Sequence, residues 1–298
     1  PIKNQNIVNK PQIKNIPDIR EFLHKYTNKD IIYIPNPGNA GDSLIAYGTI
    51  QIFNELNIKW KLGQIQSIYK NKTLFYGGGG NLVGLYTDCK NFINRNKNNN
   101  NNIVLLPHTI KDEDKFLNDL DKNVILFCRE KTSFKYVLGK VKHKENIFLS
   151  KDMAFYIKNL NQYKNIKGEG ICNAFRTDCE KTNIKIPKNN IDLSIHFWLR
   201  NNTGAYNVIK EVSLSLFEYI SKYNIINTNR LHIAIASSLL NKKVNFYPNS
   251  YYKNKSVYNY SLHNIFKNTS FLTELIVNHS PKSTKDTEHI NVFYNEHC

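Results

Sequence analysis

An arginine and a histidine two positions apart are the residues of this chain best suited to chemistry. Arg230 and His232 lie between a short β-branched run, 224–227, and an apolar run rich in alanine and serine, 233–240. The first run is typical of a strand and the second of a helix packed on a sheet. The pair is therefore predicted at a strand-to-helix turn, near a helix N-terminus, where anions bind favourably.

Arginine holds a phosphate or carboxylate with paired donors, and histidine transfers protons near neutral pH. Arg230 and His232 thus predict an anionic substrate whose reaction needs proton transfer. The plainer alternative is a solvated arginine beside a helix-capping histidine, and the pair alone does not decide between the two.

Glycines and charged residues also follow other predicted strands, at 31–34, 73–76, 103–106, 124–127 and 171–175. The carboxyl ends of parallel strands share one edge of a sheet, so these groups can converge there. Each of these groups can also be interpreted without a ligand, as a turn, a helix cap (Asp42) or a local salt-bridge cluster (176–180). The groups are 38–42, 77–80, His108, Arg129 and Arg176. They match neither the dinucleotide-binding fingerprint nor a Walker motif.

The alternation of strands with helices predicts an α/β fold of doubly wound type. Helices are expected at 17–25, 43–56 and 207–223, and further strands at 192–197 and 243–247. A polar stretch rich in lysine and asparagine, 159–170, interrupts the pattern. We therefore expect two domains, 1–160 and 161–298, with a hinge in that stretch and a ligand cleft between them.

Composition narrows the classes of partner. The 298 residues carry a formal net charge of +17, but the lysines are scattered among asparagines rather than grouped with aromatic residues, so nucleic-acid binding is not predicted. The apolar runs are too short to span a bilayer, and the first residues lack the apolar core of a signal peptide. These two observations predict a cytoplasmic protein. They leave peripheral contact with a membrane open. The five cysteines lack zinc spacing; reduced thiols that fill core space, and no metal site, are expected.

The ordered set of motifs resembles the polysaccharide pyruvyl transferases, over roughly residues 31–260. One departure is His108, where that family more often has glutamine. The matching segments are 39–42, 77–80, 106–109, 128–130 with Ser133, 175–180 and 229–232.

The resemblance implies two Rossmann-like domains facing a cleft, as in GT-B glycosyltransferases. It implies transfer of a pyruvyl group from phosphoenolpyruvate to a sugar of a cell-surface polysaccharide or exopolysaccharide, as a ketal across two hydroxyls, with no cofactor besides this donor substrate. Arg129 and Arg230 would bind the donor anion, and His232 would transfer the proton. The remaining donor-binding residues would be Arg176, His108, Gly78, Gly79, Asn39 and Asp42.

Two other functions fit the same residues. A GT-B glycosyltransferase would use the basic sheet edge to hold the diphosphate of a nucleotide sugar. A non-catalytic binder of anionic glycans would use the positive charge and the 18 tyrosines.

Overall fold

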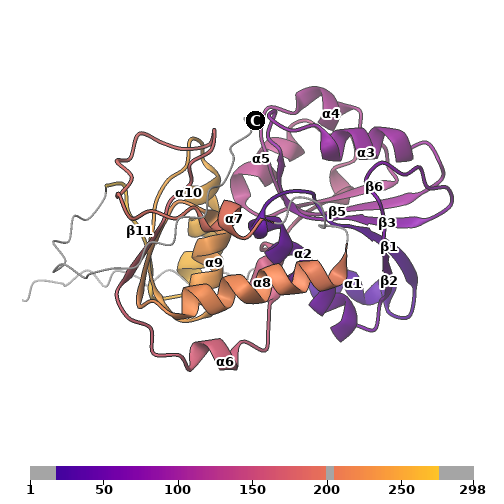
Figure 1. Ribbon diagram of the computed structural model, residues 1–298. Helices are drawn as coiled ribbons and strands as arrows, with labels where there is room; N and C mark the ends of the chain where they lie inside the picture. The colour runs from indigo at the N-terminus through magenta and orange to yellow at the C-terminus, as the bar shows by residue number, and fades with distance from the viewer. Residues whose placement is uncertain (1–17, 199–204, 275–298) are drawn as a thin grey trace, which may run out of the picture.

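Two parallel β-sheets frame the molecule (Figure 1) in a computed structural model that describes residues 18–198 and 205–274. The first sheet has the strand order β2-β1-β3-β5-β6-β7, with β4 paired to β5 beyond the end of β3. Its strands are β1 Asp30–Ile34, β2 Lys59–Leu62, β3 Thr73–Tyr76, β4 Gly79–Leu82, β5 Asn102–Ile110, β6 Val124–Cys128 and β7 Ile147–Leu149. The second sheet, in the order β11-β10-β9-β8, consists of β8 Ile171–Ala174, β9 Ile225–Thr228, β10 Lys243–Phe246 and β11 Thr269–Phe271.

Helices α2, α8 and α9 lie between the two sheets, whereas α3, α4 and α5 cover the other face of the first sheet (Figure 1). The α-helices are α1 Ile19–Leu23, α2 Ala40–Glu55, α3 Asp88–Asn96, α4 Asp114–Asn118, α5 Lys131–Leu138, α6 Asn161–Lys164, α7 Leu193–His196, α8 Tyr206–Ser221, α9 Leu231–Leu239, α10 Lys253–Val257 and α11 His263–Ile265. Short helical turns add η1 His24–Tyr26, η2 Lys144–Asn146, η3 Met153–Tyr156 and the π-helical turn η4 Tyr258–Leu262.

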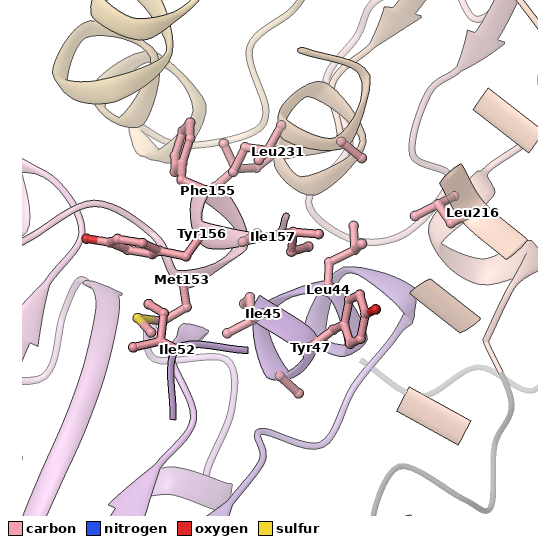
Figure 2. Close-up of a cluster of buried hydrophobic side chains, with 14 of the residues drawn as sticks. Leu44, Ile45, Tyr47, Ile52, Met153, Phe155, Tyr156, Ile157, Leu216 and Leu231 are labelled. Carbon is pink, nitrogen blue, oxygen red and sulfur yellow. The ribbon is translucent and has the colours of Figure 1, made fainter. Parts of the chain in front are cut away.

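One apolar core joins the two sheets. Helix α2 places Leu44 in a cluster with Leu216 of α8, Leu231 of α9 and the η3 segment (Figure 2). Leu44 and Leu216 are fully buried, as is Met153 of η3. Residues from before and after the polar stretch 159–170 therefore share the same hydrophobic core.

The mixed α/β class, the parallel pairing and most of the expected strands are confirmed. The first sheet ends with β7 and the second begins with β8, so the stretch 159–170 does separate two sheets. The division into domains 1–160 and 161–298, and their likeness to GT-B domains, stay predictions. None of the helices in the described ranges has the length and apolar character needed to cross a membrane.

The strand expected at 192–197 is wrong: this segment forms the short helix α7. After an isolated bridge between Asn190 and Asn173, the N–H groups of Ile195 and His196 donate back to the Asp192 carbonyl, at 3.0 and 2.9 Å. Alternation of apolar residues suggested a strand, but the adjacent residues Leu193 and Ser194 are the buried ones, as in a helix.

Two helix starts and one cysteine also differ from expectation. Helix α2 begins at Ala40 rather than Ser43, because Asn39 caps it. Asp18, expected inside the first turn of α1, is its N-cap and accepts from the Arg20 N–H. Cys89, Cys128 and Cys172 fill core space as expected, whereas Cys179 is exposed. Cys298 and Pro17 lie outside the described residues.

Because Leu44 is buried where α2, α8 and α9 meet, Leu44→Ala should leave a cavity that packing on both sides cannot close. We expect the free energy of unfolding, measured by urea denaturation, to fall by about 2–5 kcal/mol. Leu85→Ala is the matched control, since Leu85 is 55% exposed and its loss should change stability by less than about 0.5 kcal/mol. Equal stability of the two variants would contradict a shared core.

Candidate active site

A pocket of about 140 Å³ lies where the carboxyl ends of strands from both sheets approach one another. Residues after β1, β4 and β6 of the first sheet line it together with residues after β8 and β9 of the second. Its charged lining residues are Asp42, Asp88, Arg129, Arg176, Asp178, Glu180, Arg230, His232 and Lys253. Converging strand ends therefore form the site, as the sequence predicts.

Arg129 follows β6 and is almost completely buried, with a side chain 1% exposed. Its Nε donates to Thr109 Oγ1 and its Nη1 to Asp152 Oδ2, both at 2.8 Å. Nη2 has no hydrogen-bond acceptor among the described residues and faces Gly80, where a Cβ atom would lie 3.3 Å away. The guanidinium is thus fixed on two sides, and its third nitrogen remains available to a ligand.

Asp152 joins Arg129 to His232. The same Oδ2 that accepts from Arg129 lies 3.3 Å from His232 Nε2, and Oδ1 accepts from the Ala154 N–H at 2.8 Å. Burial alone would raise the pKa of Asp152, but the charge and hydrogen bond of His232 and the charge of Arg129 hold that pKa below its ordinary value of 3.8. Asp152 is therefore a buried carboxylate that orients both groups and neutralises one positive charge.

The N-terminus of α2 supports the other side of the His232 ring. Asn39 Oδ1 accepts from the Gly41 N–H at 2.8 Å, and Asp42 Oδ2 accepts from the Asn39 N–H at 3.1 Å, which makes a reciprocal capping box. A Cβ atom on Gly41 would lie 2.6 Å from His232 Nδ1, so only glycine lets the imidazole come this close. Asp42 is buried, which raises its pKa, and nearby His232 opposes that effect.

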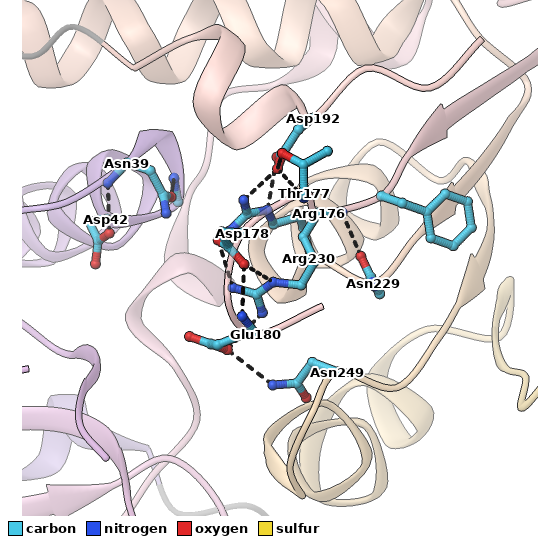
Figure 3. Close-up of polar contacts among 12 residues, drawn as sticks. Asn39, Asp42, Arg176, Thr177, Asp178, Glu180, Asp192, Asn229, Arg230 and Asn249 are labelled. Atoms are coloured by element: carbon cyan, nitrogen blue, oxygen red, sulfur yellow. Dashed lines mark hydrogen bonds and ion pairs between the residues drawn. The ribbon is translucent and has the colours of Figure 1, made fainter. Parts of the chain in front are cut away.

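Arg176 and Arg230 form a network with three carboxylates (Figure 3). Arg230, the N-cap residue of α9, donates to both oxygens of Asp192, at 2.9 and 2.6 Å, and its Nη1 lies 2.7 Å from Asp178 Oδ2. Arg176, after β8, holds Asp178 through Nε and Nη2 and donates from Nη1 to Glu180 at 2.7 Å. The local salt-bridge alternative for segment 176–180 is thus correct, although the same cations also line the pocket.

Lys253 is a pocket residue that sequence reasoning missed. It begins α10, pairs with Glu180 and has a side chain that is only 9% exposed. Burial lowers its pKa to about 8, although Glu180 opposes the shift. The pKa of Glu180 is about 2, because the charges of Lys253 and Arg176 outweigh the effect of burial. Lys253 stands in a run of lysines and asparagines, where nothing in the sequence sets it apart.

Six of the predicted site residues line the pocket, and three do not. Those that line it are Asn39, Asp42, Arg129, Arg176, Arg230 and His232. Gly78 and Gly79 precede the lining residue Gly80 in the chain: a Cβ on Gly78 would meet the Pro107 carbonyl at 2.6 Å, and Gly79 has a φ of +144°. Gly78 therefore permits a close backbone approach, and Gly79 permits a backbone conformation that other residues rarely adopt. Donor contact by Gly78 and Gly79 stays a prediction that the pocket geometry does not support.

His108 lies within β5 rather than at its end, is fully buried and does not line the pocket. Its ring stacks on Tyr76, and its Nδ1 is 2.5 Å from the Leu106 carbonyl oxygen. Burial lowers the pKa of His108 to about 3, so the ring is neutral near pH 7. Its predicted contact with donor is not supported by this position. Within residues 18–198 and 205–274, no three His, Cys, Asp or Glu side chains are grouped so as to hold a metal ion.

Asp152→Asn should test the link between Arg129 and His232. The variant leaves a buried guanidinium unpaired, so unfolding free energy at pH 7 should fall by about 3–5 kcal/mol. The folded state holds the pKa of Asp152 below 3.8. The contribution of Asp152 to the free energy of unfolding is therefore complete well above pH 3.8 and declines as the pH falls below that value. The difference in unfolding free energy between Asp152→Asn and the parent chain, measured by urea denaturation, should therefore become smaller from pH 5 to pH 3. Asp114→Asn, at an exposed ion pair with Lys140, is the control; a difference that does not vary with pH would contradict the assignment.

Comparisons with known proteins agree with the motifs. The family model for polysaccharide pyruvyl transferase matches residues 39–251. A solved structure of a functionally uncharacterised protein from Klebsiella pneumoniae subsp. pneumoniae is 36% identical, covers 86% of this chain and 97% of its own, and superposes with a TM-score of 0.73. A comparison with curated proteins gives no significant match. The family match spans most of the chain and includes strands of both sheets, and the protein belongs to the polysaccharide pyruvyl transferase family.

Proposed function

We propose that this transferase takes its pyruvyl group from phosphoenolpyruvate and attaches it as a ketal to two hydroxyls of a sugar in a polysaccharide. The observation that carries the proposal is the meeting of four cations and His232 in one small pocket: Arg129, Arg176, Arg230 and Lys253. Phosphoenolpyruvate has a phosphate and a carboxylate, each suited to a guanidinium fork. Pockets for larger ligands measure about 300–1,000 Å³, so a volume of about 140 Å³ favours this small donor over a nucleotide sugar.

The proposed reaction begins with proton transfer from His232 to the donor methylene, which becomes a methyl group. Positive charge then develops at the adjacent carbon, where one sugar hydroxyl attacks and loses its proton. The proton of this first hydroxyl passes to the now neutral His232. Phosphate leaves with the C–O electron pair, and the second hydroxyl closes the ketal as its proton passes to phosphate or solvent. Asp152 would stabilise the imidazolium before transfer and keep the ring oriented, since its Oδ2 lies 3.3 Å from Nε2.

The proposal is tested by phosphate release from phosphoenolpyruvate in the presence of a panel of glycan acceptors. His232→Gln should lower kcat by about 10²–10⁴, the usual contribution of a positioned acid, while donor affinity by calorimetry stays near that of the parent chain. His143→Gln, at an exposed histidine outside the pocket, should behave as the parent. Normal turnover by His232→Gln would refute the acid role, and turnover with a nucleotide sugar in place of phosphoenolpyruvate would refute the donor.

Donor binding should also depend on the charge of Lys253. Because its pKa is about 8, the ammonium group loses its proton as the pH rises through that value, and donor affinity should decline between pH 7 and 9.5. Lys253→Arg keeps the charge over this range, so the decline should largely disappear. Calorimetric titrations at four pH values measure the effect, with Lys158→Arg, an exposed lysine, as the control. The same decline in Lys253→Arg would exclude Lys253 as its source.

A further inference from the structure

Asp178 lies between the two arginines that the C-terminal sheet contributes to the pocket (Figure 3). Its Oδ1 is 2.7 Å from Arg176 Nε, and its Oδ2 is 3.1 Å from Arg176 Nη2 and 2.7 Å from Arg230 Nη1. A single carboxylate therefore receives a fork from one guanidinium and a further contact from the other. This is the arrangement that a bound carboxylate or phosphate would adopt.

The other two carboxylates of the network are held differently. Asp192 is 6% exposed and also accepts from the Thr177 N–H, and Glu180 is 5% exposed and also accepts from Asn249 and Lys253. Asp178 is 27% exposed, and its only other donor in the described structure is the Glu180 N–H at 3.2 Å. Asp178 is thus the carboxylate of this network that is most exposed and least supported.

Both arginines would keep their positions without Asp178. Asp192 holds Arg230 through Nε and Nη2, and Glu180 holds Arg176 through Nη1. If the Asp178 side chain rotates away, Arg230 Nη1 and the Nε–Nη2 edge of Arg176 become free donors that still face the same point. With Asp178 turned away, a dianionic ligand would also meet less electrostatic repulsion between the arginines than it would with Asp178 in place. In the present arrangement three carboxylates balance three cations: Asp178, Glu180 and Asp192 against Arg176, Arg230 and Lys253.

We propose that Asp178 is an internal stand-in for the donor anion: it occupies an anion subsite between Arg176 and Arg230, and the phosphate or carboxylate of the donor displaces it. The proposal rests on the proposed function for the identity of the donor, but not for the existence of the subsite. A carboxylate held by two arginines is a poor base, so Asp178 acts as a specificity residue rather than as a proton acceptor. It keeps the arginines paired until a ligand of equivalent charge arrives, and a neutral ligand leaves it in place.

Competition by Asp178 lowers the apparent affinity for the donor, because binding requires the state in which the subsite is vacant. Asp178→Asn retains the size of the side chain and removes the charge. Phosphoenolpyruvate should therefore bind this variant about tenfold more tightly, the scale of one charge-assisted hydrogen bond. Inorganic phosphate or pyruvate should do the same, according to which donor group takes the subsite. A purely structural role predicts the opposite, since arginines that lose their orientation would bind anions more weakly.

The experiment measures the dissociation constants of phosphate, pyruvate and phosphoenolpyruvate by calorimetry at constant ionic strength. Asp178→Asn and Asp178→Ala should both tighten anion binding, whereas Asp192→Asn, which frees Arg230 from its deeper partner, should weaken it. Asp114→Asn changes the net charge equally at an exposed ion pair and should bind as the parent does. Tighter binding of phosphate alone, or of pyruvate alone, identifies which donor group takes the subsite.

Unchanged or weaker anion binding by both Asp178 variants would overturn the proposal, as would equal tightening in Asp114→Asn. The outcome is separate from that of the proposed function. If the parent chain releases no phosphate from phosphoenolpyruvate, but Asp178→Asn still binds inorganic phosphate more tightly, the subsite stands and the donor assignment fails. If phosphoenolpyruvate turns over while Asp178→Asn shows a raised KM, the donor stands and the internal stand-in is wrong.

Discussion

The pairing of Asp152 with both Arg129 and His232 is the interaction on which the site depends. Each partner comes from a different part of the fold, since Arg129 follows β6 and His232 lies in the first turn of α9. A guanidinium as deeply buried as that of Arg129 needs a compensating charge, and Asp152, the N-cap residue of η3, supplies it. The same oxygen orients the imidazole. One carboxylate therefore both compensates the charge of Arg129 and fixes the orientation of the His232 ring.

Much of this site can be read from the sequence, because strands and glycine- or cation-containing turns have strong local signals. The Arg230–His232 turn, the arginine after β6 and the arginine after β8 were all predicted at strand ends and all line the pocket. Asp152 and Lys253 could not be found in this way. Asp152 follows β7 in a segment without a recognisable motif, and Lys253 stands among other lysines. Their importance comes from long-range contacts that local pattern does not encode.

The errors have a similar origin. The sequence predicts His108 just after a strand at 103–106, but β5 continues through it to Ile110, since β4 and β6 pair with β5 on either side. The segment at 192–197 has the alternation of a strand, yet Asp192 is held by Arg230 and the chain turns there into α7. In both cases tertiary contacts overrode the local sequence pattern. The fold class survived these errors because it depends on the repeated alternation of elements rather than on any one of them.

Helix α2 shows why the pocket and the core cannot vary independently. Its N-terminus carries the Asn39–Asp42 capping box and the glycine that admits the His232 ring, while its body packs on α8, α9 and η3. Helix α9 carries His232 itself, and Asp152 immediately precedes η3. The α2 N-terminus, His232 and Asp152 are thus attached to elements that already share a close-packed apolar interior. A displacement of one element would disturb that packing before it moved a side chain in the pocket, so the apolar core sets the precision of the charged site.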